Sequence, residues 1–330
     1  MSYRKNFYRG PKPTWSSYTD QQLLDLRFCD LKLRAQDTVF PERMERLYRE
    51  LSKRGIGFRP HYWLSQEWFS PVGIPGIAIP FFIAHPRLMK LEDRQVLEVE
   101  GGTESWCMQL IRHEAGHAID AAYRLHRRKR WRQLFGSNSK TYPDFYRAKP
   151  MSRHFVRHLD SWYAQAHPAE DFAETFAVWL QPGKPWRRHY RDWPALKKLE
   201  YVDELMKEIA GKPAPVRSRR QMSPLPKIKT TLREYYEKKR AHYMPGEDGI
   251  PDPDLLRLFS RGKGRRKAAA FLRRVPLFSA RQVPLVNNNN DMPFLLLPGQ
   301  RRVPGRYPCD RSAGKGLRPS PGPASSYRRE

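Results

Sequence analysis

One segment constrains this chain more than any other, because it joins a regular helical pattern to side chains that are costly to bury. Residues 105–128 read SWCMQLIRHEAGHAIDAAYRLHRR and favour a helix throughout, with Thr103 or Ser105 available as its N-cap. The apolar side of this predicted helix carries Cys107, Leu110, Ile111, Ala118 and Ala121. The ionisable groups in the middle of the segment would therefore point into the fold, where they need partners.

Those groups form the pattern His113-Glu114-Ala115-Gly116-His117. On a helix, the spacing of four residues places His113 and His117 on one face, where a single tetrahedral zinc ion can accept both imidazoles. Glu114 lies beside them and can act as the general base toward a water molecule that zinc has acidified. The alternative is an ordinary helix in which the pattern arose by chance, which leaves two histidines and a glutamate buried without a metal.

A catalytic zinc site needs a third protein ligand and keeps one position open for water. A second predicted helix, HPAEDFAETFAVWL at residues 167–180, begins near Pro168 and offers Glu170 and Glu174. Both carboxylates share a face, so that one can bind the metal while the other accepts a hydrogen bond from a ligand imidazole. Taken alone, Glu170 also fits a solvated carboxylate favoured by the positive end of a helix dipole.

The segment HEAGHAID at 113–120, followed by AEDFAETF at 169–176, resembles a bacterial family of zinc-binding metallopeptidases. It is more distantly similar to the catalytic domain of the lethal factor toxin, a gluzincin. The first resemblance extends from about Trp15 to about residue 260, and the second covers only the two motif helices. The resemblance to the toxin implies Glu170 as the third zinc ligand, Glu174 as a partner of a ligand imidazole, and Tyr163 as the residue that stabilises the transition state.

Other polar residues near the motifs have alternative roles. A phenol at Tyr163 can donate to the oxyanion formed during attack on a carbonyl, or it can be an aromatic packed beside Trp162. His167 is a ligand by residue type, but its position outside the helix favours a structural role. Asp120 either orients a ligand imidazole or pairs with an arginine. Three histidines are expected to be ordinary polar residues: His126, His154 and His158.

Together with these motifs, the helix and strand signals in the rest of the sequence predict an α+β fold, with a zincin-like metallopeptidase domain at residues 18–211 and a small mixed sheet. Two helices are expected within 18–55, separated at Pro41, and another from 195 to about 211. Strands are expected at 76–86 (GIAIPFFIAHP) and 95–101 (QVLEVEG). Pro80 suits either an edge strand that receives extended substrate or a buried strand that bends at the proline.

The termini differ from this domain in composition. Residues 1–17 form a basic N-terminal arm, and residues 212–274 a basic helical extension with helices near 231–243 and 254–274. Residues 211–330 contain 16 of the 30 prolines. The Pro/Arg-rich tail at 275–330, which includes four consecutive asparagines, is expected to be disordered because it cannot bury enough apolar surface to offset the entropy of ordering.

The net charge of +28 is concentrated toward the C-terminus, where residues 211–330 hold 27 Lys and Arg against 9 Asp and Glu. Such a field favours non-specific contact with polyanions. The alternative function is thus a catalytically inactive zinc-fold protein that binds nucleic acid or a protein partner through this basic region. No known nucleic-acid motif is present, and a peptide or protein substrate remains the main expectation.

The sequence also predicts where the protein works. The N-terminus has basic residues without an apolar run behind them, and no stretch approaches the roughly 20 apolar residues of a membrane span. Three scattered cysteines are too few for a disulfide framework: Cys29, Cys107 and Cys309. These features indicate a cytoplasmic protein in a reducing compartment.

Overall fold

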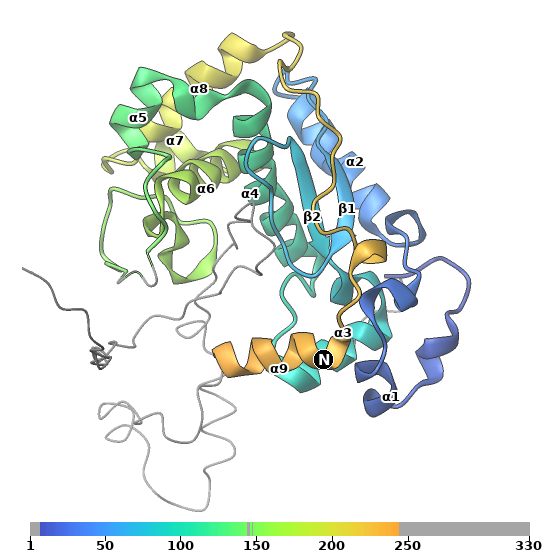
Figure 1. The fold of residues 1–330 in the computed structure, drawn as a ribbon. Coiled ribbons are helices and arrows are strands. Elements are labelled where there is room, and N and C mark those ends of the chain that lie inside the picture. Colours follow the sequence, from blue (N-terminus) through green and yellow to red (C-terminus); the bar gives the residue numbers. More distant parts are fainter. Residues whose placement is uncertain (1–6, 144–145, 147, 244–330) are drawn as a thin grey trace, which may run out of the picture. The chain divides into compact units, whose positions relative to one another are not determined.

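Helices dominate the described part of the chain and accompany a sheet of only two strands (Figure 1). The computed structural model describes residues 7–143, 146 and 148–243. The α-helices are α1 (Asp20–Leu24), α2 (Phe40–Ser52), α3 (Pro86–Val96), α4 (Glu104–Tyr123), α5 (Lys129–Phe135), α6 (Pro168–Leu180), α7 (Trp186–His189), α8 (Leu196–Ile209) and α9 (Leu232–Tyr243). The strands are β1 (His61–Ser65) and β2 (Gly76–Pro80). Short 3-10 helices are η1 (Thr14–Ser17), η2 (Phe28–Leu31), η3 (Ala35–Asp37), η4 (Phe81–Ala84), η5 (Leu125–Arg127), η6 (Asp160–Gln165) and η7 (Leu225–Lys227).

The sheet is parallel, with His61 opposite Gly76 at one end and Ser65 opposite Pro80 at the other. On the other side of β2, Phe69 forms an isolated antiparallel bridge with Ala78. Every residue of β2 is buried. The strand therefore has neighbours on both sides, and this arrangement corresponds to the buried alternative for the segment around Pro80.

Two strand predictions need correction. The segment 76–86 is a strand only as far as Pro80, because the proline ring has no N–H to continue a ladder, and the chain then turns into η4. The segment 95–101 is not a strand: Gln95 and Val96 end α3, and Leu97 adopts a left-handed conformation with φ of 63° at the C-cap. The apolar residues of this segment, which suggested a strand, belong to the end of α3 and the loop that follows it.

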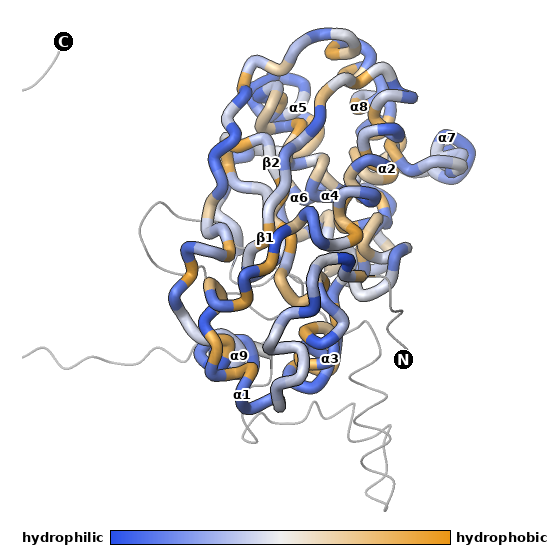
Figure 2. Tube along the Cα trace, turned by 90° about the vertical axis from the view of Figure 1, so that its right-hand side faces the viewer, coloured by the Kyte–Doolittle hydropathy of each residue, from blue (hydrophilic) through white to orange (hydrophobic). Residues whose placement is uncertain are grey.

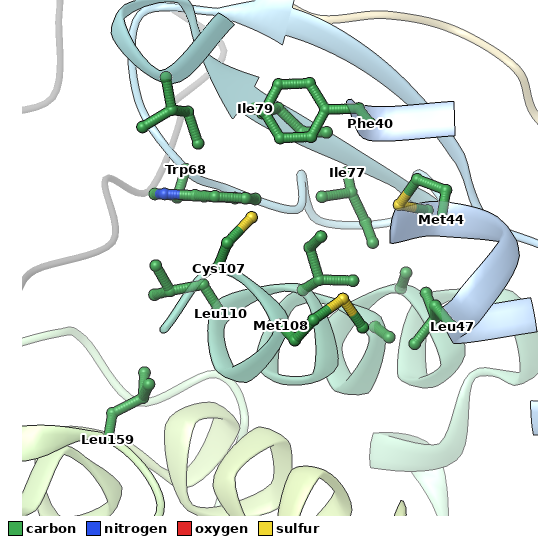
Figure 3. Packing of buried hydrophobic residues seen from close by; sticks show 14 of the residues in the cluster. Phe40, Met44, Leu47, Trp68, Ile77, Ile79, Cys107, Met108, Leu110 and Leu159 are labelled. Carbon is green, nitrogen blue, oxygen red and sulfur yellow. The ribbon is translucent and has the colours of Figure 1, made fainter. Parts of the chain in front are cut away.

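Helix α4 packs between the sheet and α6, with α2 along another side. Figure 3 shows Cys107, Met108 and Leu110 of α4 facing Ile77 and Ile79 of β2, with side chains of α2 completing the layer. The N-cap is Thr103, whose hydroxyl accepts a hydrogen bond from the backbone N–H of Trp106 at 3.3 Å. The apolar pattern of this segment thus fixes which face of α4 lies against the sheet and which turns toward α6.

The approach of α4 to α6 is closest at the motif itself. A Cβ atom on Gly116 would lie 2.8 Å from Cα of Ala173, a contact that would force the backbones apart. The small residues at these two positions let the helices come close enough for their side chains to meet across the interface. This contact places the motif of α4 opposite the acidic residues of α6.

Other helix predictions agree with the structure to different degrees. The helices at 168–180, 196–209 and 232–243 are confirmed. The region 18–55 holds a short α1 and two 3-10 turns before α2, and Pro41 stands in the first turn of α2 instead of dividing two helices. None of the described helices is both long and apolar enough to cross a membrane.

Residues 212–243 are predicted by the sequence to form an extension outside the domain expected at 18–211, but they contact the core of that segment. The segment after α8 runs beside β1, where His61 and Trp63 hydrogen-bond to the carbonyl oxygens of Arg220 and Met222. Helix α9 packs on α3 and α1, at the same end of the described chain in both views (Figures 1 and 2). The predicted helix at 254–274 and the tail at 275–330 lie outside the described residues.

Candidate metal centre

Helix α4 brings the two histidines of the motif together. One turn separates them, so their rings meet edge to face with centroids 4.9 Å apart, and the two Nε2 atoms are 3.1 Å apart. The side chain of His113 is 1% exposed and that of His117 is 13% exposed. Two imidazole nitrogens facing each other at this distance require a proton or a metal ion between them, because two lone pairs repel.

Helix α6 completes the triangle. Its N-cap is His167, and Glu170 follows in the first turn, where the carboxylate is fully buried. Glu170 Oε2 lies 3.1 Å from Nε2 of His113 and 3.1 Å from Nε2 of His117. Burial by itself would raise the pKa of Glu170, but the two histidines outweigh it and hold the pKa well below its ordinary value. The carboxylate is therefore ionised.

These three donor atoms fit a divalent metal. They form a nearly equilateral triangle, and ligand atoms around a tetrahedral zinc lie roughly 3.3 Å apart when their bonds are about 2.0 Å long. Two imidazoles and one carboxylate are ligand types that zinc accepts, and they leave a fourth position open. Within the described residues, neither Glu170 nor Glu174 has an ion pair with Lys or Arg.

Glu174 supports one of the ligands. Its Oε1 lies 2.8 Å from Nδ1 of His113, and its Oε2 accepts the backbone N–H of Leu159 at 2.9 Å. Because an ionised carboxylate can only accept, Nδ1 donates its proton to Glu174, and Nε2 faces Glu170, where its lone pair can bind a metal once its own proton is lost. Burial lowers the pKa of His113, but Glu170 and Glu174 outweigh it and raise the pKa to about 10. A metal bound here has to displace a proton.

Glu114 lies beside this triangle on α4. Its side chain is buried, and burial raises the pKa of its carboxyl group. Oε2 has no hydrogen-bond partner within the described part of the chain, whereas the backbone oxygen accepts the hydroxyl of Ser70 at 3.0 Å. A buried carboxylate oxygen without a partner is costly, and such groups concentrate at sites that bind or transfer protons.

Tyr163 also lies at the site. It is buried in η6, and its ring centroid is 5.6 Å from that of His113. The two residues before it, Ser161 and Trp162, have φ values of 61° and 53°, a left-handed conformation that is unfavourable for side chains other than glycine. Strain of this kind persists where surrounding contacts hold the chain in place, and here it occurs directly before Tyr163.

Two residues of the site had no motif to predict them. Tyr142 donates its hydroxyl to Glu170 Oε1 at 2.5 Å, and burial, with Glu170 next, raises its pKa well above the ordinary value. His158, expected to be an ordinary polar residue, is buried behind Glu174 and hydrogen-bonds to the carbonyl of Gln109 at 2.9 Å. Burial lowers its pKa to about 4, so the ring is neutral. Both residues lie outside the two motifs and have no regular spacing relative to them.

Asp120 is placed differently from either sequence alternative. Its two carboxylate oxygens bind the backbone N–H and Nδ1 of His126, each at 2.7 Å. The pair joins the end of α4 to η5. His167 has the structural role expected of it: Nδ1 accepts the backbone N–H of Ala169, and Nε2 lies 2.8 Å from the carbonyl of Lys140.

Residues 108–182 match a family model described as "Putative zinc-binding metallo-peptidase". The range contains both motif helices almost completely, and with them every donor atom of the triangle. The predicted resemblance to zinc-binding metallopeptidases is therefore confirmed for this segment. No curated protein and no solved structure matches the chain significantly.

Proposed function

We propose that the chain is a zinc-dependent peptidase with a zincin-like fold and a gluzincin-type site, acting on a peptide or protein. His113, His117 and Glu170 would hold the zinc. The observation that carries this proposal is the triangle of donor atoms, each 3.1 Å from the other two, on two helices that pack directly against each other. Ionisable groups are not assembled in this way in an apolar core without a counter-charge.

Zinc bound at the triangle would act as a Lewis acid toward the substrate carbonyl and lower the pKa of water in the open position. Glu114 accepts a proton from the attacking water. As the peptide C–N bond breaks, Glu114 returns that proton to the leaving amine. Its unpartnered Oε2 and its raised pKa suit a group that must gain and lose a proton in each cycle.

Two further residues would support the reaction, one by orienting a zinc ligand and the other by stabilising the oxyanion. Glu174 keeps the proton on Nδ1 of His113, so that Nε2 stays available as a ligand atom. Tyr163 would donate a hydrogen bond to the oxyanion that forms when the carbonyl is attacked. Its support is the position of its ring next to His113 and the strained backbone of the two residues before it.

The test is Glu114→Gln, which keeps the size of the side chain and removes its basicity. We expect zinc content to stay at the wild-type level while hydrolysis of an unstructured protein such as casein falls by about a hundredfold to ten-thousandfold. The matched control is Glu104→Gln in the first turn of the same helix, where the side chain is 71% exposed and pairs with Arg46. Equal activity in Glu114→Gln and wild type would refute the role of Glu114 as base.

A further inference from the structure

The two oxygens of Glu170 have different partners. Oε2 faces the Nε2 atoms of His113 and His117, each at 3.1 Å. Oε1 faces away from them and accepts the hydroxyl of Tyr142 at 2.5 Å. The carboxylate has no proton to give, so the hydrogen bond depends on the tyrosine as donor. One oxygen is thus free for a metal and the other is occupied by the protein.

Tyr142 is itself held in place by the start of the helix that carries Glu170. Its ring stacks on the imidazole of His167, with centroids 3.7 Å apart and planes 13° from parallel. His167 accepts the N–H of Ala169 through Nδ1, so its Nε2 carries the proton and donates to the carbonyl of Lys140 at 2.8 Å. His167 therefore holds both sides of the Tyr142 hydrogen bond: the chain that carries the donor and the helix that carries the acceptor.

Building on the proposed function, we infer that Tyr142 is a positioning residue that makes Glu170 a one-oxygen ligand of the zinc. The terminal torsion of a glutamate is soft, so a carboxylate without this hydrogen bond can rotate and present both oxygens to a metal. A second oxygen would fill the position that a catalytic zinc keeps open for water. By binding Oε1, the hydroxyl of Tyr142 preserves that position and orients the ligand.

The experiment compares Tyr142→Phe with Tyr146→Phe. Phenylalanine at 142 keeps the ring that stacks on His167 and removes only the hydroxyl. Tyr146 belongs to the same segment, and its hydroxyl donates to the carbonyl of Ser161 at 2.9 Å, so Tyr146→Phe removes a tyrosine hydroxyl that donates to the backbone and not to Glu170. For each full-length variant, zinc affinity is measured by competition with a chromogenic chelator, and visible absorption is recorded after Co²⁺ replaces Zn²⁺.

We expect Tyr142→Phe to bind zinc about tenfold or more weakly. Its Co²⁺ form should absorb less strongly in the visible than that of the wild type, because a second carboxylate oxygen raises the coordination number above four. Tyr146→Phe should match the wild type in both measurements. A purely structural hydrogen bond at Tyr142 would change stability without altering the Co²⁺ spectrum.

The outcomes separate this inference from the proposed function. If the wild type binds one zinc and Tyr142→Phe has the same affinity and the same Co²⁺ spectrum, the role of Tyr142 is overturned while the zinc site stands. If the wild type binds neither zinc nor Co²⁺, the proposed function fails and this inference fails with it. A changed spectrum in both variants would also overturn the inference, because it would trace the effect to the segment and not to the hydroxyl on Glu170.

Discussion

Two clusters of buried or partly buried acidic residues in this protein have different positive partners. In the lysine cluster, made of Glu67, Glu92, Tyr235 and Lys239, the ammonium group of Lys239 binds both carboxylates, at 3.0 Å for Glu67 and 2.9 Å for Glu92. In the candidate zinc site, three buried glutamates gather around two histidines. Within the described residues, none of these three has an ion pair with Lys or Arg.

The difference suggests a criterion that separates a structural polar cluster from a candidate cation site. A buried carboxylate is stable only with a nearby positive charge and hydrogen-bond donors. The lysine cluster contains its own cation and joins α9 to α3. The candidate zinc site has donor atoms directed at one point and, among the described residues, no Lys or Arg paired with its glutamates. Its positive charge can therefore come either from protons on the histidines or from a metal ion that replaces them.

The first prediction concerns removal of zinc from the candidate zinc site. Purified wild type should contain one zinc per chain by elemental analysis, and His117→Ala should contain none. At a free zinc concentration a thousand times Kd, binding stabilises the folded state by about 4 kcal/mol. A chelator should therefore lower the free energy of unfolding of the wild type by roughly this amount and leave His117→Ala unchanged, as measured by urea denaturation.

A matched control is His126→Ala, which removes a histidine that pairs with Asp120 beyond the end of the same helix. This variant should keep its zinc and its response to the chelator. A well-folded wild type without zinc would contradict the contrast between the two clusters, because protonated histidines alone would then balance the buried carboxylates.

The second prediction concerns removal of the ammonium group of Lys239 from the lysine cluster. Lys239→Met keeps the length of the side chain but leaves Glu67 and Glu92 without their positive partner. Loss of one member of a buried ion pair costs roughly 3 kcal/mol or more, so the urea midpoint should fall accordingly. Zinc content should stay at one per chain, because the lysine cluster and the candidate zinc site share no residue.

Lys238→Met is the control, since Lys238 is exposed on the same helix and should tolerate the change within about 0.5 kcal/mol. Equal stability of Lys239→Met and wild type would mean that the buried carboxylates do not need their ammonium partner. That result would remove the physical basis of the comparison, since the candidate zinc site is identified by the same requirement for a counter-charge.

The sequence could predict the candidate zinc site better than the fold around it. Helical spacing of four residues is a strict geometric rule, and it was sufficient to place His113 with His117 and Glu170 with Glu174 on matching faces. Helices α4 and α6 meet closely because Gly116 has no side chain at their contact. The spacing of residues within one helix does not predict this contact. Long-range packing of this kind is decided by shape and not by local pattern.

The parts that sequence analysis missed depend on partners distant in the chain. Tyr142 acquires its role only when the segment before α6 folds back onto Glu170, 28 residues later. Asp120 bonds to His126 because the chain turns at the end of α4, where Arg124 adopts a left-handed conformation. The segment 212–243 looked separate because of its charge and prolines, yet its contacts to β1 use backbone carbonyls, which any sequence provides.

The smallest effect concerns the pH response of the lysine cluster. Burial raises the pKa of Glu92 to about 7 despite the opposing charge of Lys239, while Glu67, Tyr235 and Tyr236 also face this carboxyl. A carboxyl with a raised pKa binds its proton more tightly in the folded state. Its contribution to stability is therefore fully present below about pH 4.5 and is lost as the pH rises through about 7.

Glu92→Gln removes this proton and keeps the shape of the side chain. Between pH 5.5 and 8, the free energy of unfolding of the wild type should fall by about 2 kcal/mol more than that of Glu92→Gln, as measured by urea denaturation across the range. Taking the difference between the two proteins cancels the histidines that titrate in both. Glu237→Gln, at an exposed position on α9, should follow the wild-type profile. If Glu92→Gln and wild type show parallel profiles, Glu92 is already ionised in the folded state, and the ammonium of Lys239 compensates the buried carboxylates more completely than the comparison assumes.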